Sequence, residues 1–122
     1  MITWNNLDTL EAFKNLSKAE RVNIAEAMSG ENGAERVKTY STPMAEGLAY
    51  NYAAKQVDDK VLEDLQKLAD EAQLTEKFEA LYNGEVINTG EKRMVLHHLT
   101  RGQLGEAVNA DGTDKRAFYK EQ

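Results

Sequence analysis

The chain has 122 residues with 15 Lys and Arg against 21 Asp and Glu, a formal net charge of −6 and a pI near 5.0. This acidic balance disfavours duplex nucleic acid and anionic membrane surfaces, so we expect neither as a partner. Without cysteine, disulfides, zinc–thiolate sites and thiol nucleophiles are excluded. No apolar stretch approaches the ~18 residues of a membrane span. No secretory signal is recognisable at the start, so we expect a cytoplasmic protein.

Short helices are expected before residue 43. Apolar side chains at three-residue spacing predict an amphipathic turn or helix over residues 7–13. Ser17 and Glu20 have the capping-box pattern, so we expect a second helix to begin there and to end at Gly30. Its apolar stripe consists of Val22, Ile24, Ala25 and Met28.

The pattern changes around the only proline, Pro43, which should stop a third short helix over residues 34–40. Alternating large side chains then predict an extended segment within residues 47–57. Asp58 or Asp59 can cap the clearest helix of the chain, because each can accept a bond from a free backbone N–H. One side of that helix is apolar, with Val61, Leu62, Leu65, Leu68, Ala69 and Ala72.

Thr75 is expected to cap the next helix, and Asn83 with Gly84 should end it because both tolerate a left-handed backbone. Its expected buried edge consists of Phe78, Leu81 and Tyr82. After a brief extended passage, Asn88 or Thr89 can cap a further helix that carries the two histidines. Turn signals follow at Gly102, Gly105 and Asp111–Gly112, and residues 114–122 have the pattern of an opening helix.

These patterns predict a mainly α chain with one or two short extended stretches. We divide it into residues 1–43, which carry the short helices, and residues 44–122, which form a longer helical segment.

His97 and His98 are the only histidines, and they invite a metal or catalytic interpretation. Neighbours on a helix point about 100° apart, whereas a zinc pair on a helix is spaced i, i+4 and needs further ligands. A packing role is the better reading, with His97 on the buried side and His98 toward solvent or a partner. We therefore expect His97→Ala to destabilise the domain and His98→Ala to have little effect.

A helix-turn-helix is a second possibility, because two short helices meet around residues 29–31. Recognition helices need basic side chains, and Arg36 and Lys38 are available. Glu31 and Glu35 offset them locally, which argues against DNA binding. The scattered glycines form no phosphate-binding motif, and the acidic pairs lie at helix ends or on polar faces.

Residues 84–101, GEVINTGEKRMVLHHLTR, resemble the segment G-E-K-I-N-x-T-E-x-R-A-V-L-H-x-A-L-R of the glucose-6-phosphate isomerase (phosphoglucose isomerase) family. The matching positions, without a gap, are Gly84, Glu85, Ile87, Asn88, Glu91, Arg93, Val95, Leu96, His97 and Arg101. The departures are Val86, Gly90, Met94, Leu99 and Thr100. A weaker similarity extends back to about residue 44, with Tyr52 and Val57 as its best matches. His97 falls on the family's fixed histidine and His98 on a variable position, which implies that they are not a paired site.

The resemblance implies that these residues form the N-terminal helical part of an α/β enzyme of the sugar-isomerase sandwich type. That enzyme would bind a sugar phosphate and interconvert glucose 6-phosphate and fructose 6-phosphate by general-base proton transfer through an enediol, in glycolysis and gluconeogenesis. It would need no metal or organic cofactor and would be a homodimer.

The family's phosphate loop and its G-G-R-[FY]-S and Q-x-G-V-E-x-x-K signatures do not occur here, so no catalytic, cofactor-binding or metal-binding residue can be carried over. We expect a segment truncated at its C-terminal end, structural in itself and inactive alone. The alternative is a standalone acidic helical module that binds another protein. A segment should leave apolar surface bare, whereas a finished module should cover its leucine stripes and cap its last helix.

Overall fold

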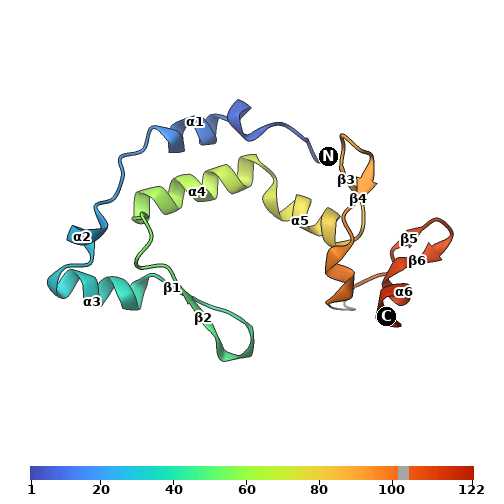
Figure 1. Cartoon of the computed structure of the whole chain (residues 1–122). Helices are drawn as coiled ribbons and strands as arrows, with labels where there is room; N and C mark the ends of the chain where they lie inside the picture. The colour runs from blue at the N-terminus through green and yellow to red at the C-terminus, as the bar shows by residue number, and fades with distance from the viewer. Residues whose placement is uncertain (102–104) are drawn as a thin grey trace. The chain divides into compact units, whose positions relative to one another are not determined.

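The computed structural model describes residues 1–101 and 105–122 (Figure 1). Its described part is mainly helical, with three two-stranded antiparallel sheets. The predicted fold class is therefore confirmed, although the extended segments form more hairpins than the sequence indicated. The chain divides into two compact units, residues 11–68 and residues 1–10 with 69–122, and each is described by itself. The division after residue 43 stays a prediction.

The unit of residues 11–68 begins with three helices, α1 (Glu11–Ser17), α2 (Ile24–Ala27) and α3 (Gly30–Thr39). The hairpin of β1 (Ser41–Pro43) and β2 (Ala49–Asn51) follows (Figure 1). In this hairpin Thr42 is paired opposite Tyr50. The 3₁₀ turn η2 (Ala45–Gly47) joins its strands, and Glu46 and Gly47 both have positive φ there. The expected extended segment and the stop before Pro43 are confirmed.

The longest helix, α4 (Asp59–Glu71), runs from this unit into the other. The backbone N–H of Val61 donates to Asp58 Oδ1 at 2.8 Å, so Asp58 is the predicted cap. Asp64 accepts hydrogen bonds from Lys60 at 2.7 Å and Lys67 at 3.2 Å, one turn before and after it. The pKa of Asp64 is lowered by these two bonds, and the bond to Asp64 raises the pKa of Lys60.

The expected helix from Ser17 to Gly30 is wrong. Ser17 ends α1, where its hydroxyl donates to the carbonyl of Lys14, and Asn23 caps the single turn of α2. Gly30 instead starts α3, with a φ of +59°. Gly33 supplies a physical reason, because a Cβ there would lie 2.2 Å from the carbonyl oxygen of Met28. Its missing side chain lets α3 approach the end of α2, which favours two short helices at an angle over one continuous helix.

The unit of residues 1–10 and 69–122 holds the 3₁₀ turn η1 (Leu7–Thr9) and helix α5 (Leu74–Tyr82). The side chain of Gln73 ties the N-terminal residues to this helix. Its Oε1 accepts from the backbone N–H and the hydroxyl of Thr3, and its amide donates to the carbonyl of Met1. Gln73 adopts a left-handed backbone before α5, so the predicted cap at Thr75 is wrong.

Two further hairpins complete this unit, β3 (Val86–Asn88) with β4 (Arg93–Met94), and β5 (Asn109–Ala110) with β6 (Thr113–Asp114). The 3₁₀ helix η3 (His97–Thr100) lies between them, and α6 (Lys115–Lys120) follows with Asp114 as its cap. The predicted helix after Asp114 is confirmed. So is the stop at Gly84, whose φ is +73°.

The apolar core is small. Among the described residues its buried members are Leu10, Ala53, Ala80, Leu99 and Val108. Phe78, expected on a buried edge, is 62% exposed. Leu65, in the middle of the apolar stripe of α4, is 39% exposed and the other members are half-buried, so the stripe is only partly covered.

Candidate functional site

The segment with the two histidines is a hairpin followed by one 3₁₀ turn, so the expected helix from Asn88 or Thr89 is wrong. The packing assigned to the histidines is also reversed. His97 is exposed, whereas His98 is half-buried and stacks on the ring of Tyr82 with the ring centroids 5.2 Å apart. Nε2 of His98 lies 3.0 Å from the backbone oxygen of Tyr82 and donates to it. As predicted, one histidine faces solvent and the other packs inside, but the exposed one is His97 and the packed one is His98.

The carbonyl of Tyr82 also accepts a bond from Arg116, at 3.0 Å. The guanidinium of Arg116 donates to the carbonyl of Glu106 at 2.7 Å and lies 5.1 Å from the centroid of the Tyr82 ring. We call Tyr82, His98 and Arg116 the Tyr82 cluster. Arg116 is only 5% exposed, and carbonyl dipoles and a π face help to compensate its charge. The cluster joins α5, η3 and α6, so its role is structural.

A second arginine has the same role in the other unit. Arg36 is 9% exposed and donates to the carbonyls of Ala53, at 2.7 Å, Lys55, at 3.0 Å, and Val57. Its guanidinium also lies 4.3 Å from the ring centroid of Tyr40. We call this set the Arg36 clasp. It holds α3 against the loop that leads into α4.

The clasp bears on the helix-turn-helix hypothesis. Arg36 is one of the two basic side chains available for a DNA contact, but its Nε and Nη2 donors are bound to backbone carbonyls. It is therefore not available to a phosphate or a base edge.

The carboxylates near the clasp also have structural partners. Asp59 accepts a hydrogen bond from the Tyr40 hydroxyl at 2.8 Å, and this bond, with burial, raises the pKa of Tyr40. Asp58 caps α4, and Asp64 is bound by two lysines. The lowered pKa of Asp64 is the reverse of what a general base working near neutral pH needs.

Within residues 1–101 and 105–122, no group of three His, Asp or Glu side chains could hold a metal ion. No helix in that part of the chain is long and apolar enough to cross a membrane.

Of the turn glycines, Gly102 lies outside the described residues, and Gly105 and Gly112 both have positive φ, which suits the predicted turns.

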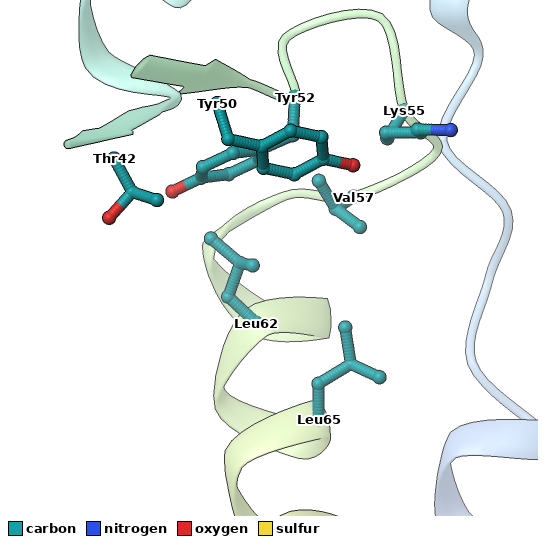
Figure 2. Close-up of a pocket in the computed structure, with 7 residues that line it drawn as sticks. All are labelled: Thr42, Tyr50, Tyr52, Lys55, Val57, Leu62 and Leu65. Carbon is teal, nitrogen blue, oxygen red and sulfur yellow. The ribbon is translucent and has the colours of Figure 1, made fainter. Parts of the chain in front are cut away.

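A concave surface with a volume of about 360 Å³ lies in the unit of residues 11–68 (Figure 2). We call it the tyrosine hollow. Its walls are Thr42, Tyr50 and Tyr52 of the hairpin, Lys55 and Val57 of the following loop, and Leu62 and Leu65 of α4. Figure 2 shows the two tyrosine rings one over the other, and their centroids are 6.0 Å apart. Its walls are mostly apolar and aromatic, and they offer no pair of acid and base groups.

Comparison with known proteins agrees with the motif at residues 84–101. Residues 51–121 match the family model described as phosphoglucose isomerase. The chain is 51% identical over 121 residues to the glucose-6-phosphate isomerase of Treponema denticola, covering 95% of this chain and 23% of that protein. It is 41% identical over 125 residues to the enzyme of the same name from Treponema pallidum (strain Nichols), covering 99% of this chain and 23% of that protein.

The glucose-6-phosphate isomerase of Borreliella afzelii is 40% identical over 124 residues, again across 23% of its length. The chain therefore spans less than a quarter of the curated relatives that it matches. Because the family model matches more than half of the residues, the chain belongs to the phosphoglucose isomerase family.

Proposed function

We propose that these 122 residues are the N-terminal structural segment of a glucose-6-phosphate isomerase. The observation that carries the proposal is the family match over residues 51–121, together with relatives of that name of which the chain covers 23%. The ungapped similarity of residues 84–101 to the family's motif points the same way.

The exposed apolar surface supports a segment over the alternative of a finished interaction module. A finished module would cover the leucine stripe of its main helix, yet Leu65 is 39% exposed. The last helix does not favour a segment in the same way, because a finished module is expected to cap that helix. The N–H of Glu121 does bond to the carbonyl of Phe118 at its end.

The whole enzyme would interconvert glucose 6-phosphate and fructose 6-phosphate by moving a proton between C1 and C2 through an enediol. Such a step needs a positioned carboxylate near the acidic C–H, with a pKa suited to accepting the proton. The buried carboxylate of the described residues, Asp64, is ion-paired and has a lowered pKa. We therefore propose that the base, the ring-opening groups and the phosphate loop lie outside these residues, and that the chain alone is inactive. The enzyme would be a cytoplasmic homodimer.

The test is an isomerase assay on two purified proteins, the product of the whole reading frame and the 122-residue chain. Fructose 6-phosphate is converted in a reaction coupled to oxidation of the glucose 6-phosphate formed. We expect turnover by the longer protein only. Turnover by the 122 residues would contradict the proposed inactivity, and no turnover by the longer protein would contradict the proposed enzyme.

A further inference from the structure

The unit of residues 11–68 has almost no apolar core of its own. Every residue of this unit is described, and Ala53 is the one apolar side chain in it that is buried. A domain of this size normally buries about 60% of the surface of its unfolded chain. The groups buried here with Ala53 are instead Gly33, Arg36 and Asp64, which contribute little hydrophobic stabilisation.

The accessible surface of the chain gives the same result. At 13.7 kDa the structure exposes 9402 Å². A folded monomer of this mass exposes about 6,600 Å², and two separate domains of half the mass would expose about 8,000 Å² in total. Even two domains that do not touch would expose roughly 1,400 Å² less than this structure does. The excess is therefore not explained by a lack of contact between the two units. More surface is bare than the chain's own units account for.

The tyrosine hollow is a concave part of that bare surface. Tyr50 is 48% exposed and Leu65 is 39% exposed on opposite walls, and Leu48, next to β2, is 65% exposed. Lys55 lies at the edge of the hollow (Figure 2), and none of the ion pairs of the described residues involves it. The hollow therefore suits an apolar side chain with a carboxylate nearby, which would face the Lys55 ammonium group.

We propose that the tyrosine hollow is the docking site for the rest of the same polypeptide, an apolar segment of the isomerase outside residues 1–122. This inference rests on the proposed function. We choose this occupant for two reasons. The relatives have more than three quarters of their length beyond the aligned region, and the bare area exceeds what the units of this chain explain. Docking there would fix α4 and the β1–β2 hairpin against the catalytic portion.

Cysteine labelling tests the proposal, because residues 1–122 contain no cysteine. Leu65→Cys and Tyr50→Cys place a thiol on each wall of the hollow, and Glu63→Cys places one on the exposed side of α4 as the matched control. Each variant is made in the longer protein and in the 122-residue chain. The rate of reaction with a thiol reagent is measured natively and in urea, and mass spectrometry confirms which cysteine reacts.

In the longer protein we expect both hollow thiols to react at least about tenfold more slowly than in urea, while the control reacts at nearly the unfolded rate. In the 122-residue chain all three should react fast. Fast labelling of the hollow thiols in the longer protein overturns the proposal. Slow labelling in the 122 residues alone also overturns it, since these residues would then cover the hollow themselves.

Protection that disappears when the longer protein is diluted to monomers would assign the hollow to a second copy instead, and would overturn the chosen occupant. Isomerase activity is assayed separately on the unsubstituted longer protein. Absence of activity would contradict the proposed function without changing the labelling result. Failure of the proposed function and failure of the proposed docking site can therefore be told apart.

Discussion

At the scale of single residues, two adjacent histidines have different surroundings and should respond differently to mutation. His98→Ala removes a hydrogen bond to the Tyr82 carbonyl and a stacked ring, so we expect a loss of about 1–2 kcal/mol in the free energy of unfolding. His97→Ala is the control, and because His97 is exposed it should change that free energy by less than about 0.5 kcal/mol. Urea unfolding measures both, and equal losses would contradict the assignment.

Gly84 combines a left-handed backbone with a close contact. Its φ is +73°, and a Cβ there would lie 2.2 Å from Cγ1 of the buried Val108. Gly112 has a similar φ of +71° with nothing within 4 Å. Gly112→Ala should therefore cost only the backbone strain, about 1–2 kcal/mol. Gly84→Ala should cost about 1–3 kcal/mol more because it overpacks the contact.

Thermal unfolding of these two glycine variants, side by side, separates strain from contact. Equal shifts in Tm would show that Val108 moves aside freely and would contradict the packing described for Gly84.

Asp64 gives a prediction about pH. Its pKa is lowered by Lys60 and Lys67, so between the folded and unfolded pKa values the unfolded state binds more protons and stability rises with pH. Its contribution is present above the unfolded value of about 3.9 and is lost as pH falls through the folded value. Asp64→Asn should therefore be less stable than the wild type at pH 7, and the difference should shrink below pH ~4.

Urea midpoints at neutral and acid pH check this prediction, with Glu63→Gln on the same helix as the control. A difference between wild type and Asp64→Asn that is the same at both pH values would contradict it.

At the scale of elements, the Arg36 clasp joins α3 to the loop before α4. Arg36→Lys keeps the charge, but an ammonium group cannot reach three carbonyls in different directions. We expect a loss of about 2–3 kcal/mol in the free energy of unfolding, because carbonyls are left without donors. Arg93→Lys, on a side chain that is 75% exposed, should change it by less than about 0.5 kcal/mol. Similar losses for both substitutions would show that the clasp contributes little.

The elements that the sequence predicted well are those with local signals. Asp58 caps α4 through a bond within three residues, Gly84 ends α5 with a left-handed backbone, and Asp114 caps α6. Each signal acts between neighbours in the chain, so a short stretch of sequence contains it.

The elements that it missed depend on contacts between distant residues. The histidine segment forms a hairpin and one 3₁₀ turn, in which His98 bonds to a carbonyl 16 positions away. Arg116 bonds to the same carbonyl from 34 positions away, and Arg36 reaches carbonyls 17 to 21 positions away. The spacing of apolar residues along the sequence does not indicate such pairs.

At the scale of the whole molecule, the small core, the bare tyrosine hollow and the match to relatives about four times as long have one explanation. Under the proposed function, the 122 residues would supply a helical scaffold, and the isomerase chemistry would belong to residues outside them. A motif of 18 positions was enough to indicate the family, which the match over residues 51–121 confirms, whereas the bare surface is visible only in the structure.

The first measurement to make is to read the coding sequence past the codon for Gln122. We expect an open frame that soon encodes a loop rich in serine and threonine, followed by the G-G-R-[FY]-S and Q-x-G-V-E-x-x-K signatures. A stop codon at that position would contradict the proposed function, because a protein of 122 residues would then lack the segments proposed to carry the isomerisation.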